Sequence, residues 1–206
     1  ALSHSCLANE AASDKDLTLF RARVSTVVEA RTSVLYASTL ILASSRFVFA
    51  TFADIANAIP WRIITAHGRL HMENLGFAPS LAAAILGVRV GMSGFGRLTG
   101  SLSDFFPPRY IMALALTFTA IGVAGLWYAK TSAVAYVCVA LMGIGYGAAF
   151  TTIPVIFGNL FGRDAFVGLA GFRVAITGLV GFYGVSWAGS VADQSGTYDS
   201  VLLILA

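Results

Sequence analysis

Long apolar stretches separated by short polar connections make up most of the chain after about residue 34. A helix needs about 20 mostly apolar residues to cross the hydrocarbon core of a bilayer, which is about 30 Å thick. One such stretch lies within 34–66, and four more cover 80–102, 110–129, 131–162 and 165–192. A further apolar stretch begins near Ser200. The pattern predicts an all-α membrane protein, a polytopic helical bundle of five spans and the start of a sixth.

The first span has two possible registers. One centres it on 34–59 and places Arg46 deep in the membrane, whereas the other begins near Phe47, leaves Arg46 at the surface and continues through a kink at Pro60. An arginine at the centre of the bilayer costs about 2.5–3.5 kcal/mol on insertion scales. We therefore favour the second register.

Composition agrees with a membrane protein, since 57% of the 206 residues are hydrophobic and 11% are charged. Soluble domains have about 45–50% apolar and about 25% charged residues. Residues 1–33 are the polar exception, and we interpret them as a cytoplasmic loop preceding a transmembrane bundle over 34–206. The net charge of +3 comes from bases spread singly along the chain, so we expect no nucleic-acid partner.

Short connections between spans make neighbouring helices antiparallel, so alternate connections lie on the same side of the membrane. Residues 1–33, 103–109 and 162–164 carry the basic residues of one side, and the acidic 193–199 connection lies on the other. Cytoplasmic loops carry an excess of Lys and Arg, which places the first group in the cytoplasm. The chain starts at Ala1 and stops at Ala206 inside an apolar stretch, from which we predict a fragment of a longer protein.

A glycine-rich run, Gly143-Ile144-Gly145-Tyr146-Gly147, could be mistaken for a nucleotide-binding loop. It follows no strand and lacks the third glycine of that motif at the required spacing. Small residues in membrane spans instead let helix backbones approach closely. We interpret the run as a helix-packing surface and expect no cofactor.

The connection between the second and third spans is unusually charged. Arg97 and Asp104 are seven residues apart, so they can share one face of a helix, and Arg109 follows in the same connection. Pro107 and Pro108 suit the first turn of the next helix. The structural interpretation is a charge-paired turn that holds two helices together.

The run Gly100-Ser101-Leu102-Ser103-Asp104, followed by Arg109, resembles the G-x-L-x-D-R-x-G-R-R motif of the major facilitator superfamily. It keeps the first glycine, the leucine, the aspartate and one late arginine, but has Phe105, Pro107 and Pro108 in place of a base, a glycine and a base. This copy is similar to the degraded second copy of the motif. Other stretches fit the C-terminal half of such a transporter in order and spacing: 74–80, 143–147, 161–163 and 189–198.

The resemblance covers about residues 40–206 and implies helices 7 to 11 of the superfamily fold, with helix 12 truncated. It implies transport by alternating access, with Asp104, Arg97 and Arg109 as a cytoplasmic gate that stabilises one state. It also implies a substrate site between two six-helix halves, so the missing N-terminal half would be the main partner of this chain.

Arg89 and Arg173 each stand alone near the middle of a span, where an ionisable residue is a candidate for a functional site. No acid within the later spans offers itself as a partner, and a guanidinium matches a carboxylate bidentately. The pattern is similar to the monocarboxylate and oxalate/formate branches, which use bases in helices 8 and 11; Arg97 or Arg89 would match the first and Arg173 the second. The alternatives are an ion pair with the absent half for Arg89 and capping of unwound backbone carbonyls for Arg173.

Two further groups have open roles. Asp54 is a candidate proton carrier in a symporter, or else a helix–helix contact. His67 and His71 lie four residues apart with Glu73 close by, but a zinc site usually needs a third or fourth ligand. We therefore expect the end of a helix there and no metal site.

Together these features predict a secondary carrier that moves a small organic anion, such as a monocarboxylate, with a coupled proton or in exchange. The substrate-binding candidates are Arg173, Arg89 and Arg97. An enzyme is disfavoured because no histidine and no deep acid lies in the later spans. The alternatives are a half-length membrane protein that acts as a receptor-like or interaction partner, and a carrier of a neutral solute.

Overall fold

The computed structural model describes residues 44–205, except for the side chains at positions 100, 104, 163–165 and 199. The predicted polar loop over 1–33 therefore lies outside the described residues. The described part is helical, with these elements: α2 (Ser45–Asn74), α3 (Pro79–Leu98), the 3-10 helix η1 (Thr99–Asp104), α4 (Pro108–Trp127), α5 (Ser132–Ser195) and α6 (Asp199–Leu205).

Helix α5 is two spans joined at Gly162, whose backbone angles (φ 78°, ψ 168°) interrupt the helix. We call Ser132–Gly162 the first segment of α5 and Phe166–Ser195 its second segment. With α2, α4 and the stretch Pro79–Ser103, they give five helices long and apolar enough to cross a membrane. The protein is an integral, multi-pass membrane protein, and the predicted helical bundle is confirmed in the described residues.

The favoured register of the first span is confirmed. Helix α2 begins at Ser45, and Arg46 is exposed in its first turn. The helix then continues through Pro60 as one element of 30 residues. The remaining span boundaries differ from the predicted ones by only a few residues.

Prolines and a threonine set several helix starts. Pro79 occupies the first turn of α3, and Pro108 does so in α4, as the sequence predicted for the Pro107-Pro108 pair. Proline suits this position because its missing N–H would have no partner inside the helix anyway. The Thr131 side chain accepts a hydrogen bond from the Val134 N–H at the start of α5.

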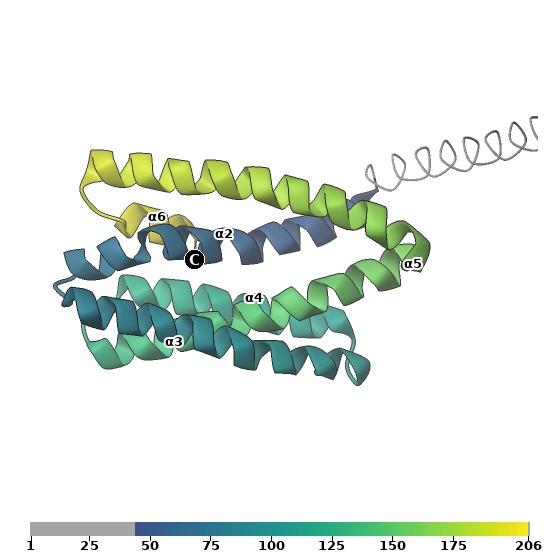
Figure 1. The fold of residues 1–206 in the computed structure, drawn as a ribbon, viewed down its shortest axis with the longest axis horizontal. Helices are drawn as coiled ribbons and strands as arrows, with labels where there is room; N and C mark the ends of the chain where they lie inside the picture. Colours follow the sequence, from purple (N-terminus) through teal and green to yellow (C-terminus); the bar gives the residue numbers. More distant parts are fainter. Residues whose placement is uncertain (1–43, 206) are drawn as a thin grey trace, which may run out of the picture. The chain divides into compact units, whose positions relative to one another are not determined.

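The helices run alternately up and down the bundle (Figure 1). The α3–α4 connection and the break at Gly162 lie at one end, and the α2–α3, α4–α5 and α5–α6 connections lie at the other. This is the pairing of connections that the sequence predicted. The second segment of α5 lies along α2, on the side of α2 away from α3 and α4.

The glycine run of α5 is a helix-packing surface, as predicted. A Cβ atom on Gly143 or Gly147 would overlap backbone atoms of α3, and one on Gly145 would overlap the Ala115 carbonyl of α4. The first segment of α5 therefore packs closely against both helices. Among the described glycines of α3, only Gly96 makes such a contact, against Ile144. At Gly87, Gly91 and Gly94, no neighbouring atom lies within 4 Å of the position that a Cβ would take.

Candidate functional site

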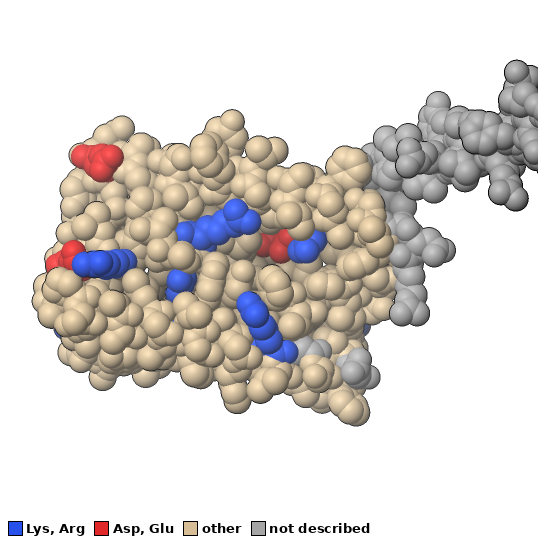
Figure 2. All heavy atoms as spheres, viewed as in Figure 1, with Lys and Arg blue, Asp and Glu red and all other residues tan. Residues whose placement is uncertain are grey.

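A cavity of about 230 Å³ lies where α2 meets both segments of α5. Its polar lining residues are Asp54, Asn57, Arg62, Arg173 and Thr177, and its apolar ones are Ala58, Tyr146, Phe150, Ile153 and Val174. Figure 2 shows basic side chains and one acidic group gathered over the middle of this face, apart from the charged groups at its left end. Charged groups at this depth in a membrane protein are costly and are typical of functional sites.

Arg173 is paired with Asp54 across the cavity. Its Nη1 donates a hydrogen bond to Asp54 Oδ2 at 2.7 Å, and the two side chains are 20% and 9% exposed. The Thr177 hydroxyl lies 3.4 Å from the same carboxylate oxygen and also bonds to the Arg173 carbonyl. The partner that the later spans did not offer thus comes from the first span. Arg173 contacts this carboxylate rather than unwound backbone carbonyls, and its role toward a substrate stays a prediction.

Arg89 lies inside the bundle and is only 2% exposed. Its Nη1 donates to the Trp61 carbonyl at 3.1 Å and its Nη2 to the Thr65 hydroxyl at 2.8 Å, and its guanidinium lies 4.0 Å from the centre of the Trp61 ring. Its Nε is buried without a hydrogen-bond partner among the described residues. Arg89 therefore joins α3 to α2 and is not among the residues that line the cavity.

The three predicted gate residues are only partly described. The Arg97 guanidinium lies 4.8 Å from the centre of the ring of Phe150, a residue that lines the cavity. Arg109 is exposed and donates to the hydroxyl of its neighbour Tyr110 at 3.2 Å. The Asp104 side chain lies outside the described residues, so its pairing with Arg97 or Arg109 stays a prediction.

Arg62 is a cavity residue that sequence reasoning missed. It lies past the middle of α2, its side chain is exposed, and it has no ion pair with a described acid. A Cβ atom added to Gly181 would lie 2.6 Å from Arg62 Cδ and 2.9 Å from Nη1, so the side chain rests on bare backbone of α5. A charged residue inside an apolar stretch was a visible signal, but the uncertain register of the first span hid its depth.

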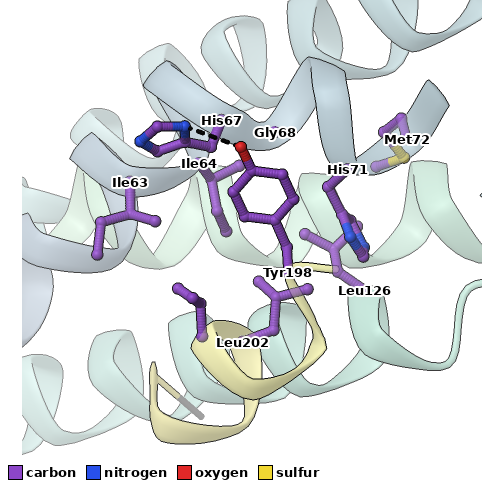
Figure 3. Close-up of a pocket in the computed structure, with 10 residues that line it drawn as sticks. Ile63, Ile64, His67, Gly68, His71, Met72, Leu126, Tyr198 and Leu202 are labelled. Carbon is purple, nitrogen blue, oxygen red and sulfur yellow. Dashed lines mark hydrogen bonds between the residues drawn. The ribbon is translucent and has the colours of Figure 1, made fainter. Parts of the chain in front are cut away.

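A second polar cluster lies near the α5–α6 connection (Figure 3). The Tyr198 hydroxyl points at His67 Nδ1, 3.2 Å away, and His67 Nε2 lies 3.1 Å from the Val185 carbonyl. A carbonyl only accepts, so Nε2 carries the proton and Tyr198 donates to Nδ1. The cavity beside them is about 10 Å³, room for about one water. Among the described residues, no group of three His, Cys, Asp or Glu could hold a metal ion.

Comparisons with known proteins find no match to this chain, either among protein-family models or among curated proteins. The resemblance to the major facilitator superfamily therefore rests on the motifs alone. What stands independently is a multi-pass membrane bundle with a charged cavity at the junction of three spans.

Proposed function

We propose that the protein is a secondary carrier that moves a small organic anion across its membrane by alternating access. The observation that carries the proposal is the cavity among α2 and the two segments of α5, with an acid and two arginines inside an apolar bundle. A purely structural bundle gains little from such charges, because each is costly to place in the membrane. Ligand sites of this kind combine an apolar wall with a few convergent polar groups.

The charge balance of the cavity favours an anion. Asp54 and Arg173 form an ion pair at 2.7 Å, while Arg62 makes no ion pair with an acid among the described residues. Arg89, buried against Trp61, and Arg97, beside Phe150, add positive charge nearby. An anionic substrate entering the cavity meets a net positive field, and a cationic one is repelled.

Asp54 is the proposed site of proton coupling, since it is the one acid among the described residues that line the cavity. Protonation of its carboxylate would remove the attraction to Arg173 and free a second cation in the cavity. A proton can drive a conformational change only if it binds one state better than the other, and a pair that forms in one state and opens in the other provides that difference.

The remaining parts of the proposal come from the family resemblance. Asp104, with Arg97 and Arg109, stabilises one of the two alternating states at the cytoplasmic end. A further six-helix half provides the opposite wall of the site, near the middle of the membrane, as in transporters built from two repeats. The protein carries out no bond-making chemistry.

The test is labelled-substrate counterflow in proteoliposomes that contain the complete gene product. The panel holds lactate, pyruvate, oxalate, formate and benzoate, with a neutral sugar and an aliphatic amino acid as controls. The variants are Arg173→Gln, Asp54→Asn and the combination of the two, with Arg69→Gln as a control for arginine loss on α2. Arg69 is exposed and pairs with Glu73 on its own helix, away from the cavity lining.

Uptake of a carboxylate that is lost in the Asp54 and Arg173 variants, but kept in Arg69→Gln, is the expected result. An inward proton gradient should increase this uptake in the wild type and not in Asp54→Asn. Uptake of only the neutral solutes would contradict the anion assignment. Absence of any uptake from a well-folded complete protein would favour the receptor-like or interaction partner instead.

A further inference from the structure

The geometry points to a narrower substrate class: we infer that the cavity takes carboxylates that carry a flat aromatic ring, with Arg62 as the carboxylate ligand. The inference rests on the proposed function and refines it. Arg62, which no sequence motif indicated, binds the carboxylate. Asp54 and Arg173 are already paired with each other, so Arg62 is the cavity cation that remains for a ligand.

The first step concerns which arginine is available. Arg173 already donates to Asp54 at 2.7 Å and is 20% exposed. Arg62 lines the same cavity with an exposed side chain and has no ion pair with a described acid. Because a guanidinium offers a fork that fits a carboxylate, Arg62 is the cavity cation best placed to bind one.

The second step concerns how Arg62 is held. Its side chain lies against Gly181 on the second segment of α5, where a Cβ would come within 2.6 Å of Cδ, 2.9 Å of Nη1 and 3.0 Å of Nε. The contact involves the stem and the guanidinium alike, so the missing side chain at 181 makes room for this orientation. Position 181 therefore acts as a positioning residue for Arg62.

The third step concerns the wall of the cavity formed by the first segment of α5. Tyr146 and Phe150 lie there with ring centres 6.1 Å apart, and Tyr146 stacks on Trp61 at 3.9 Å. Phe150 is 50% exposed even though the Arg97 guanidinium lies 4.8 Å from its ring centre, so part of its ring surface remains open to a ligand. Aromatic pairs gain interaction energy beyond what the area that they bury provides. A ligand with its own flat ring can pack against these aromatic rings, whereas formate or lactate is too small to cover them and leaves them in contact with water.

The cavity also contains a buried polar atom that lacks a hydrogen-bond partner among the described residues. The Asn57 side chain lines it, is 2% exposed, and its Oδ1 has no hydrogen-bond partner among the described residues. A buried acceptor without a partner is unfavourable. A hydroxyl or amino group on the ligand would satisfy it, so hydroxybenzoates or aromatic amino acids should bind more tightly than benzoate.

The test is direct binding to the complete gene product in detergent, which needs no transport. The probes are benzoate, 4-hydroxybenzoate, cyclohexanecarboxylate, lactate and formate. We expect benzoate to bind about tenfold more tightly than lactate, within the range that apolar pocket contacts supply. Benzoate should exceed cyclohexanecarboxylate by about twofold to tenfold, the worth of an aromatic pair.

The variants separate the two parts of the site. Arg62→Gln should weaken benzoate binding at least about tenfold, Arg62→Lys less so, and Arg69→Gln on the same helix not at all. Gly181→Ala should weaken binding while keeping the charge, because it displaces the Arg62 side chain. Phe150→Leu should reduce the preference for benzoate over cyclohexanecarboxylate and leave the effect of Arg62→Gln intact.

The outcomes distinguish the inference from the function beneath it. Tight binding of lactate or formate without preference for the ring would overturn the aromatic assignment and leave an anion carrier standing. Benzoate binding that is indifferent to Arg62→Gln, in a variant that elutes and melts like the wild type, would overturn the role of Arg62. Failure of every carboxylate to bind would remove the proposed anion function itself.

Discussion

The two segments of α5 are similar in length and apolar character but differ in environment. They are 31 and 30 residues long, and both are apolar enough to span a membrane. Yet 50% of the most apolar stretch of the first segment is buried in the bundle, against 17% for the second. Apolar composition places a helix in the membrane, but it does not say how much of the helix its neighbours cover.

Glycine shows the same contrast at the level of single residues. Gly143, Gly145 and Gly147 of the first segment each sit against the backbone of another helix. In the second segment, a Cβ on Gly168, Gly171 or Gly178 would have no neighbouring atom within 4 Å. Small residues permit close packing of membrane helices, but a glycine contributes to such packing only where a neighbouring helix lies against it.

The second segment packs on α2 through an apolar cluster that includes Ile63 and Ala188, and charged or polar side chains of α2 also contact it at several points. Arg173 pairs with Asp54, Gly181 supports Arg62, and the Val185 carbonyl bonds to His67. The first segment is held instead by backbone-to-backbone packing with α3 and α4. A few polar contacts can open and close as discrete units, while a closely packed glycine interface moves as a rigid body, which suits the carrier proposed above.

The largest effect is expected from breaking the ion pair that attaches the second segment. Asp54→Asn or Arg173→Gln alone leaves one charge buried without its partner, at a cost of about 3–5 kcal/mol. The double variant removes both charges and should recover most of that loss. Thermal unfolding of the detergent-purified protein measures this. A double variant no more stable than the single ones would show that the pair is not a unit.

The second-largest loss of stability is expected from overpacking the first segment of α5. A Cβ at Gly147 would overlap the Ser93 carbonyl oxygen and lie 2.9 Å from the backbone nitrogen of Arg97. Overpacking of this kind costs about 1–3 kcal/mol, so Gly147→Ala should lower the melting temperature by several degrees. The matched change Gly171→Ala in the second segment should leave it unchanged. Equal losses in both variants would contradict the contrast between the segments.

The spans could be predicted because hydropathy is a local property, and so could the helix start at the Pro107-Pro108 pair. The site was harder, because it depends on which helix faces meet. Asp54 and Arg173 are 119 positions apart in sequence, and nothing local pairs them. Arg62 was overlooked because the uncertain register of the first span hid its depth, and its proximity to Gly181 appears only after α2 and α5 are packed together.

The smallest effect is expected at the end of the second segment, where Tyr198 bonds to His67. Tyr198→Phe removes this single hydrogen bond, worth about 0.5–1.5 kcal/mol, and should lower the melting temperature by only a few degrees. Ser190→Ala, which removes a hydroxyl bonded within its own helix, is the control.

The pH dependence of this contact has a definite sign. Burial, and after it the negative charge of Asp193, raises the pKa of the Tyr198 hydroxyl above its ordinary value. The folded state thus holds this proton more tightly than the unfolded state does, so the contribution to stability is present below about pH 10 and is lost as the pH rises further. The stability difference between wild type and Tyr198→Phe should therefore be constant from neutral pH to about pH 9 and shrink above pH 10. A difference that grows with pH instead would mean that the hydroxyl is not the donor to His67.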